Sequence, residues 1–500
     1  MTNRNRSRVI FWILLVGALI RIHALGQDVR FHPDEALFST FARHAALNGD
    51  WLLHGSLDKP PLALYANALS MTAFAARVEN TILTFDARTG ELAARLPSTF
   101  AHILLIAAVY VLARRLYADR RLANWAALLV ACSPVAVAFS ATAFTDGLML
   151  LCMTLALVSL SRSRGDRAWL WSGVWLALAF GSKQQGLFYL PLVIALGWAL
   201  GGLTLKRLLL LAAPILVGVT LLFVWDAARA QETSLWTLAQ INNTPEDPLT
   251  AEMLLPRLGA WLEFGRLLLG TPTILLLAAT VLAIISRTLR APRDRATVID
   301  ALLAIYALAY LAAHVLLNFN VYDRYILPLL PVLALLGVRG GMWLWRWLSR
   351  LLPPQELSLI SAALVLVFLV GGWNAAEGRV NVGGDGGNGR RGIYTGIDEL
   401  AEYLNGKPLG AILYDRWLGW ELGYYLGEWT DKRKVYYPTS ELLVAGALAQ
   451  PDPAPRYFVA PVDQPIAAWL SALEGAGFTV TRDYTSARFV VYELIPPSLR

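Results

Sequence analysis

Long apolar runs without a charged residue recur along the chain, and they constrain its fold more than any other feature. Val9–Leu19, Ile274–Ile285 and Ser361–Val370 are three of these runs. Repeated apolar stretches of about 20 residues are typical of membrane-spanning helices. Charged residues make up only 16% of the chain, whereas a soluble domain has about 25%. The sequence therefore predicts a polytopic α-helical membrane protein.

Basic residues predict the topology, because Lys and Arg accumulate in the cytoplasmic loops of membrane proteins. Six basic clusters lie before or between the apolar runs, at Arg4–Arg8, Arg114–Arg121, Arg162–Arg167, Lys206–Arg207, Arg287–Arg295 and Arg339–Arg350. If all are cytoplasmic, the N-terminus is cytoplasmic, the C-terminus is extracytoplasmic and about 11 helices span the membrane. The expected spans lie near residues 9–26, 96–113, 122–141, 146–161, 168–182, 186–203, 208–226, 265–286, 298–317, 325–338 and 356–374.

The net charge of +7 is compatible with nucleic-acid binding, but its distribution is not. The excess lies in short clusters between apolar runs, which is the pattern of membrane loops. We therefore expect membrane lipid as a partner and no nucleic acid. Cys132 and Cys152 lie in apolar runs, and no Cys/His metal spacing exists.

Residues 27–95 form one outer loop in this topology. Pro61–Val78 is apolar enough to cross the membrane, but a crossing would place Arg114–Arg121 outside, against the positive-inside rule. We therefore expect Asp34–Asn48 and Leu62–Val78 to be helices that lie at the membrane interface. A second outer loop is expected at about residues 227–264.

After Trp373 the long apolar runs end and the sequence becomes typical of a soluble domain. Gly383–Gly389 is typical of a flexible linker. Beyond it we expect helices at Leu400–Leu404 and Ile466–Leu473, and strands at Ala411–Tyr414, Tyr457–Ala460 and Phe489–Leu494. The chain thus divides into a transmembrane catalytic domain (1–376), a Gly-rich linker (377–392) and a small extracytoplasmic α/β domain (393–500).

Carboxylates occur at two outer positions. Asp34 and Glu35 follow Pro33 after the first span, where they favour a helix dipole or supply a general base or metal ligand. Asp146 lies in a short outer turn, either as a turn or N-cap residue or as a second carboxylate facing the same cavity.

Cations occur at three further outer positions. Lys59 precedes two prolines that would hold it rigidly at the membrane surface, where it snorkels or contacts a phosphate. Lys183 lies in another outer turn, and Arg324 follows Tyr322 at the outer end of a span. Each is either a loop residue facing water or a phosphate ligand.

The common side of these residues favours the functional interpretation. Asp34, Lys59, Asp146, Lys183 and Arg324 come from five places in the chain, yet the topology puts all of them at the outer face. Ionisable groups near a bilayer are costly and tend to be kept for a task. Carboxylates and cations together at one membrane face suit a reaction on a lipid phosphate.

The sequence resembles the GT-C superfamily of membrane glycosyltransferases, in particular its protein O-mannosyltransferase and aminoarabinose-transferase-like branch. The matching stretches, in the family's order, are His32–Ala36, Asp58–Leu62, Ala94–Ser98, Ala141–Leu150, Leu178–Pro191 and Tyr322–Leu335. They fall in the N-terminal two thirds of the chain, so the C-terminal domain lies outside the resemblance. Thr81–Glu91 departs from the family's pattern.

The resemblance implies a reaction and assigns residues to it. A mannose, or another hexose or pentose, would pass with inversion from a polyprenyl phosphate to a hydroxyl of a protein, lipid or glycan, at the outer face of an inner or plasma membrane. Asp34 would be the catalytic base, beside Glu35 and with Asp146 as a second acidic position. The residues near the donor phosphate would be Lys59, Arg324, Lys183 and Tyr322. No cofactor is expected, although a divalent cation shared by the two aspartates stays open.

Three rival functions differ in what they require. A multi-span transporter or flippase would place charges near mid-membrane and often shows paired broken helices in repeats, whereas here the charges gather at one face and no repeat is visible. An enzyme that transfers a whole oligosaccharide, and a lipid-binding or assembly factor without activity, both remain open.

Overall fold

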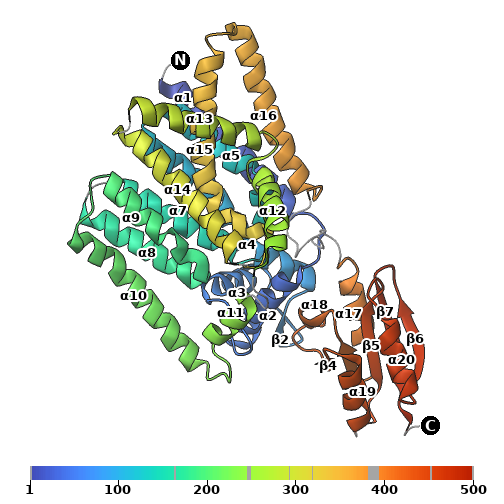
Figure 1. Ribbon diagram of the computed structural model, residues 1–500. Helices are drawn as coiled ribbons and strands as arrows, with labels where there is room; N and C mark the ends of the chain where they lie inside the picture. The colour runs from blue at the N-terminus through green and yellow to red at the C-terminus, as the bar shows by residue number, and fades with distance from the viewer. Residues whose placement is uncertain are drawn as a thin grey trace. The chain divides into compact units, whose positions relative to one another are not determined.

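The computed structural model describes residues 3–162, 165–244, 249–291, 293–317, 319–380, 394–450 and 453–497. The expected glycine linker, Gly383–Gly389, lies outside these residues. The chain divides into two compact units (Figure 1). The first unit comprises Met1–Gln27, Leu52–Asn67 and Arg95–Arg390, and the second comprises Asp28–Trp51, Ala68–Ala94 and Arg391–Arg500. This division differs from the expected one, since most of the outer loop groups with the C-terminal residues.

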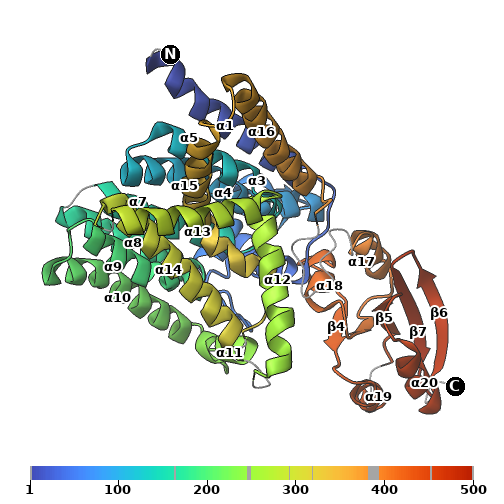
Figure 2. The same cartoon turned by 45° about the horizontal axis from the view of Figure 1, so that its top comes forward.

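The regular elements of the first unit, among its described residues, are all helices. Its elements are α1 (Asn3–Leu25), α5 (Arg120–Cys132), α6 (Pro134–Ser140), α7 (Asp146–Arg162), α8 (Asp166–Ser182), η1 (Gln184–Tyr189), α9 (Leu190–Ala199), α10 (Leu205–Ala228), α11 (Leu235–Asn243), α12 (Ala251–Leu269), α13 (Thr273–Arg290), α14 (Arg295–Leu316), η2 (Asp323–Leu329), α15 (Leu330–Leu348) and α16 (Pro354–Ala376). Two helices contribute residues to both units, α3 (Leu62–Phe74) and α4 (Ala87–Tyr117). Helices α7, α8 and α10 pack as neighbours (Figure 2).

Among the described residues, seven helices are long and apolar enough to cross a membrane, and the pair α5–α6 makes eight if it counts as one span. That pair bends by 55°, because Pro134 cannot continue the hydrogen-bond ladder of α5. The chain is thus a multi-pass membrane protein, as expected, but the expected number of about 11 spans is not confirmed. Helices α7 and α8 have 17 residues each and α9 has 10, fewer than a straight crossing usually needs.

The region expected to be a second outer loop, residues 227–264, contains helices, and the span expected after it begins later. It contains α11 and most of α12, and the following helix α13 begins at Thr273 rather than near residue 265. Helix α12 carries Arg257 and Glu263 among exposed leucines, and these charges distinguish it from the charge-free apolar runs that indicate a span.

Two buried polar clusters hold helices of the first unit together. Arg21 of α1 is fully buried, and its guanidinium donates to the carbonyl oxygens of Val130 (2.9 Å) and Ala131 (2.8 Å). These oxygens lie at the end of α5, where the helix leaves its last carbonyls without internal partners. Asp300 of α14 is also buried, and it accepts hydrogen bonds from other helices, namely from Tyr117 (2.8 Å), Arg287 (2.7 Å) and Arg339 (2.7 Å).

The C-terminal part of the second unit is an α/β fold around a five-stranded sheet of order β4-β3-β5-β7-β6. Strand β3 pairs in parallel with β4 and β5, while β7 pairs antiparallel with β5 and β6. The elements are α17 (Ile397–Asn405), β3 (Ile412–Asp415), α18 (Gly419–Tyr425), β4 (Arg433–Tyr436), α19 (Ser440–Ala449), β5 (Arg456–Pro461), α20 (Ala467–Gly475), β6 (Thr479–Thr485) and β7 (Phe489–Ile495). The five elements expected from the sequence are confirmed. Strands β4 and β6 were not expected, because edge strands carry exposed polar residues and lack an apolar run.

Segments of the first loop belong to the same compact unit. They form α2 (Pro33–Asn48) and a hairpin of β1 (Arg77–Glu79) and β2 (Ile82–Thr84). Helix α2 packs on α18, and Arg43 donates to Glu428 (2.9 Å) and to the carbonyl oxygen of Tyr424. The expected helix at Asp34–Asn48 is confirmed, whereas the one at Leu62–Val78 ends at Phe74, before the hairpin begins.

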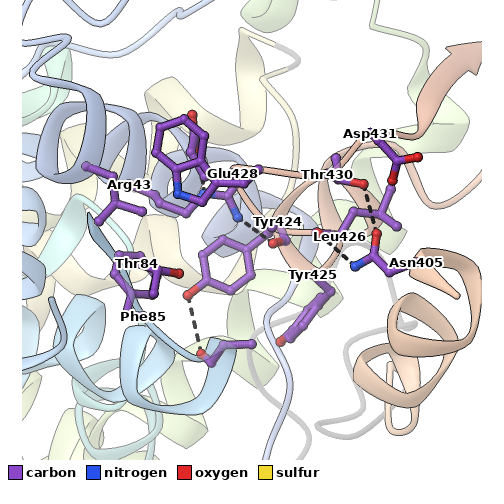
Figure 3. Close-up of a pocket in the computed structure, with 14 residues that line it drawn as sticks. Arg43, Thr84, Phe85, Asn405, Tyr424, Tyr425, Leu426, Glu428, Thr430 and Asp431 are labelled. Carbon is purple, nitrogen blue, oxygen red and sulfur yellow. Dashed lines mark hydrogen bonds and ion pairs between the residues drawn. The ribbon is translucent and has the colours of Figure 1, made fainter. Parts of the chain in front are cut away.

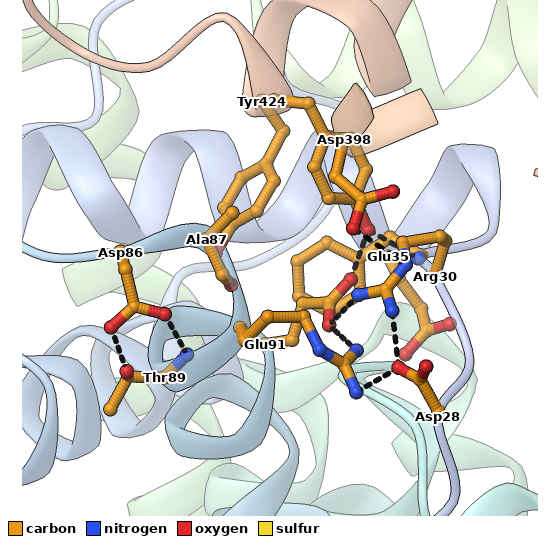
Figure 4. A network of polar contacts seen from close by, with 12 residues as sticks. Asp28, Arg30, Glu35, Asp86, Ala87, Thr89, Glu91, Asp398 and Tyr424 are labelled. Atoms are coloured by element: carbon orange, nitrogen blue, oxygen red, sulfur yellow. Dashed lines mark hydrogen bonds and ion pairs between the residues drawn. The ribbon is translucent and has the colours of Figure 1, made fainter. Parts of the chain in front are cut away.

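Glu91 connects the segment Thr81–Glu91 to other residues of its unit. Its carboxylate is fully buried and pairs with Arg30 (3.0 Å) and Arg88, and it accepts from the Tyr425 hydroxyl (Figure 4). The same hydroxyl accepts from the backbone N–H of Phe31 at 2.8 Å. The loop segment is therefore shaped by contacts with the C-terminal residues of its own unit.

Glu421 of α18 makes the second unit sensitive to pH. It is buried, its Oε1 atom has no hydrogen-bond partner among the described residues, and burial raises its pKa from 4.5 to about 8. Between these values the folded protein binds more protons than the unfolded chain, so the free energy of unfolding falls as pH rises. We expect Glu421→Gln to flatten this fall when thermal unfolding is followed from pH 5 to pH 8. The exposed Glu402 provides the control variant Glu402→Gln, and an unchanged slope in Glu421→Gln would contradict the prediction.

Candidate functional site

The first unit brings together several of the residues expected at the site. Asp146 opens α7 and Lys183 follows the last residue of α8. Lys183 Nζ lies 2.7 Å from Asp146 Oδ1, and both side chains are buried. Burial lowers the pKa of Lys183 to about 8, and although Asp146 opposes this shift, the charges of Arg324 and Lys59 add to it. Arg324 and Lys183 lie over the same Tyr325 ring, 5.7 and 4.9 Å from its centre, and Lys59 lines the same cavity as Lys183.

The turn that carries Lys183 depends on a glycine. A Cβ atom at Gly186 would lie 2.3 Å from the carbonyl carbon of Ala179, a distance that no side chain allows. The chain can therefore fold back against the end of α8 and continue as η1. This close approach explains the position of the glycine in the stretch Leu178–Pro191.

Two tyrosine hydroxyl groups form hydrogen bonds with the segment that carries Arg324. The Tyr189 hydroxyl of η1 donates to the carbonyl oxygen of Pro328, and the Tyr310 hydroxyl of α14 donates to that of Tyr325 at 2.6 Å. Both acceptors lie in η2, which is thereby held beside η1 and α14.

Aromatic rings surround the cations. The Arg324 guanidinium lies 4.9 Å from the ring centre of Tyr322 and 5.0 Å from that of Phe144, and Lys183 Nζ lies 4.9 Å from that of Tyr325. Tyr322 thus contacts a cation. Rings at these distances stabilise a positive charge through the negative face of their π-system.

Lys59 is positioned by polar contacts around its neighbour Asp58. Asp58 pairs with Lys59, and its side chain also accepts from Asn242 of α11 at 3.1 Å. Its backbone carbonyl accepts from Gln184 at 2.7 Å. The two prolines that follow Lys59 leave the chain few alternative conformations, so these contacts fix the start of α3 against η1 and α11.

These elements enclose a cavity of about 300 Å³. Its lining residues are Lys59, Lys183, Gln184, Gln185, Phe188, Ala239, Gln240, Asn243, His314, Phe319, Asn320 and Tyr325. Two lysines stand at its wall beside amide and aromatic side chains, so the cavity is suited to an anion attached to an apolar group.

Several lining residues were not selected from the sequence. Gln240 and Asn243 lie on α11, inside the segment expected to be a loop. His314 lies in an expected span, is buried, and stacks on Tyr310 with 4.2 Å between ring centres. A histidine in an apolar run is itself a signal of function in a membrane protein, and it could have been used to find this residue.

Asp34 and Glu35 belong to the second unit. Glu35 is buried and accepts from the backbone N–H of His32 at 3.1 Å, while the His32 ring accepts from the N–H of Asp34. These two bonds form a capping box at the start of α2. Glu35 therefore has a structural role in the helix cap, whereas the half-buried Asp34 is the carboxylate for which a catalytic role stays predicted. Among the residues that the structure describes, no group of three His, Cys, Asp or Glu side chains could hold a metal ion.

Fold and cavity together define a multi-pass membrane protein with a cation-lined site, and the comparisons agree with this class. Residues 58–227 match the model of the dolichyl-phosphate-mannose-protein mannosyltransferase family. An undecaprenyl phosphate-alpha-4-amino-4-deoxy-L-arabinose arabinosyl transferase of Pseudomonas paraeruginosa is 27% identical over 246 residues, which cover 46% of this chain and 42% of the relative. The enzyme of that name from Pectobacterium carotovorum is 27% identical over 45% of this chain and 40% of its own length. The chain thus aligns with less than half of each relative.

Two solved structures share the fold over nearly the whole chain. ArnT from Cupriavidus metallidurans, bound to undecaprenyl phosphate, superposes with a TM-score of 0.63 at 15% identity and covers 97% of both chains. The oligosaccharyltransferase of Archaeoglobus fulgidus superposes with a TM-score of 0.57 at 13% identity and covers 99% of this chain and 75% of its own. The expected GT-C-like fold is confirmed.

Proposed function

We propose that this protein is a glycosyltransferase that moves a sugar from a polyprenyl-phosphate carrier to a hydroxyl acceptor. The observation that carries the proposal is the cavity of the first unit, in which Lys59 and Lys183 meet amide and aromatic side chains and Arg324 stands nearby. The family model and the curated relatives, named for dolichyl-phosphate and undecaprenyl-phosphate donors, support the same substrate class. None of the relatives reported above is a transporter.

The proposed reaction assigns a role to each group. The acceptor oxygen attacks the anomeric carbon as its proton passes to the Asp34 carboxylate. The bond between that carbon and the phosphate oxygen breaks, and polyprenyl phosphate leaves with the bonding electron pair. Lys59, Lys183 and Arg324 stabilise the charge that develops on the phosphate, which fixed cations do best in a site shielded from water. Asp146 keeps Lys183 charged.

The location follows from the positive-inside rule. The N-terminus is cytoplasmic, and the C-terminal domain lies outside an inner or plasma membrane. The reaction then takes place at the outer face, and its balance requires no cofactor.

A donor assay tests the proposal. The full chain in lipid nanodiscs is given polyprenyl-phosphate mannose, glucose, arabinose or 4-amino-4-deoxyarabinose with a mixture of glycan, glycolipid and peptide acceptors. We expect one donor to release free polyprenyl phosphate, in the presence or absence of a metal chelator. No release with any donor, together with no binding of polyprenyl phosphate, would overturn the proposal.

Lys59→Ala should weaken donor use by about tenfold to a hundredfold, since a hydrogen bond to a charged group contributes about 1.5–3 kcal/mol. Lys206→Ala provides the matched control, because Lys206 is exposed at the start of α10. A reduction in protein yield without a change in donor KM would show that Lys59 only snorkels.

A further inference from the structure

A second cavity, of about 380 Å³, lies inside the second unit (Figure 3). Three parts of the chain contribute to its wall. They are the second half of α2 with Arg43, the end of the hairpin with Thr84 and Phe85, and the stretch Tyr424–Asp431, which begins in the last turn of α18 and continues beyond it. Asn405 completes the wall. The volume falls within the range of about 300–1,000 Å³ that is usual for small-molecule sites.

The charges at this cavity neutralise one another. Arg43 pairs with Glu428 at 2.9 Å and also donates to two backbone carbonyl groups. Asp431 lies 2.6 Å from the Lys432 ammonium and accepts from the N–H of Gly410 at 3.0 Å. In contrast to the cavity of the first unit, this wall presents no excess positive charge and does not suit a phosphate.

Trp429 gives the cavity an aromatic platform. The residue is 56% exposed, although it lines the cavity. Its indole N–H donates to the carbonyl oxygen of Leu83 in the hairpin at 3.0 Å, so the ring is held in place while its surface stays open to solvent. Exposed tryptophans of this kind are typical of recognition surfaces, because a rigid ring binds with little loss of conformational entropy.

The polar side chains next to Trp429 are held in place by hydrogen bonds with one another and with the backbone. The Asn405 amide donates to the carbonyl oxygen of Leu426 at 3.0 Å, and its oxygen accepts from the Thr430 hydroxyl at 2.8 Å. An asparagine amide carries two N–H donors, which leaves one that can bind an incoming oxygen.

We propose that this cavity binds a neutral pyranose ring of the acceptor. The C–H face of the ring packs on the Trp429 indole, and its hydroxyl groups bond with Asn405 and Thr430. A wall without excess positive charge, with one fixed aromatic face and small polar groups, matches a sugar, which has an apolar C–H face and hydroxyl groups around its edge. The inference rests on the proposed function in one respect, since it takes the acceptor to be a glycan or a glycolipid.

Saturation-transfer NMR on the purified full chain tests the inference. The probes are methyl α-mannopyranoside, methyl β-glucopyranoside, an N-acetylglucosamine disaccharide and a serine-containing hexapeptide. We expect saturation transfer to at least one pyranoside, and a Kd about tenfold or more higher in Trp429→Ala, as for an aromatic hot spot. Trp51→Ala is the control, because Trp51 is an exposed tryptophan of the same unit outside this wall.

Trp429→Phe keeps an aromatic face but loses the bond to Leu83, so it should bind the pyranoside with intermediate affinity. This variant keeps the inference testable if Trp429→Ala fails to fold. Equal binding by Trp429→Ala and the unchanged protein, no pyranoside binding, or Trp429-dependent binding of the peptide would overturn the inference. Comparing the binding of the free pyranosides with that of a glycolipid in nanodiscs shows whether the bound sugar ring belongs to a soluble glycan or to a glycolipid.

Kinetics distinguish this inference from the proposed function. Trp429→Ala should raise the KM for a glycosylated acceptor about tenfold and leave kcat at saturating acceptor unchanged. If no donor is used and no polyprenyl phosphate binds, but the pyranoside still binds, the proposed function fails and the sugar site stands. If donor turnover is normal and no pyranoside binds, the sugar site fails alone.

Discussion

Replacing Asp34 with asparagine should lower sugar transfer by a factor of about 10²–10⁴, the usual contribution of a general base. Asparagine has nearly the shape of aspartate but cannot take a proton from the acceptor hydroxyl. The position lies in the first turn of α2, where the neighbouring bonds of His32 and Glu35 hold the helix cap. Single-turnover transfer with a radiolabelled donor measures the chemical step.

Glu35→Gln is the matched control for this prediction. Glutamine can replace glutamate in a capping box, so the variant should keep both the helix and the activity. The binding of polyprenyl phosphate should be unchanged in Asp34→Asn. Full activity in Asp34→Asn with loss of activity in Glu35→Gln would reverse the two assignments.

The second large effect is expected at the buried pair of Asp146 and Lys183. Asp146→Asn leaves the Lys183 ammonium buried without its anion, and breaking such a pair costs about 3–5 kcal/mol. We expect a large fall in the unfolding temperature of the detergent-solubilised protein. Asp166 offers a contrast, because it is itself exposed where it pairs with Lys206 and Arg207, and Asp166→Asn should change the unfolding temperature little.

A double variant separates the structural from the chemical role of this pair. Asp146→Asn combined with Lys183→Met removes both charges, so most of the lost stability should return. Donor use should stay low, because one cation of the cavity is gone. Normal donor use in this folded double variant would show that Lys183 contributes to stability alone.

Glu35 illustrates why local sequence could not assign every carboxylate. The pair Asp34-Glu35 after a proline fits both a helix cap and an active site. The residue that makes the cap is His32, whereas Ser, Thr, Asp and Asn are the usual N-caps. The spacing from His32 to Glu35 was visible, but only the backbone geometry shows that Glu35 turns back to the His32 N–H.

Asp300 illustrates the same limit for the basic clusters. The topology counts Arg287 and Arg339 as cytoplasmic charges. The positive-inside rule makes no distinction between them and the other arginines. In the structure both donate to Asp300, which lies in an expected span. The sequence shows that such a buried carboxylate needs partners, but not which arginines supply them.

The apolar runs, the basic clusters and the short apolar stretches of the central strands by themselves determined the multi-pass fold class and the C-terminal α/β domain. These patterns are local, because burial in lipid or in a sheet acts on residues close together in the chain. Local order also singled out the residues Lys59, Asp146, Lys183 and Arg324 within short polar stretches. Only the tertiary structure decided that Asp146 pairs with Lys183, that α11 contributes to the cavity wall, and that Asp28–Trp51 and Ala68–Ala94 of the first loop form one compact unit with the C-terminal residues. Each of these outcomes depends on packing between distant segments, which no pattern along the chain encodes.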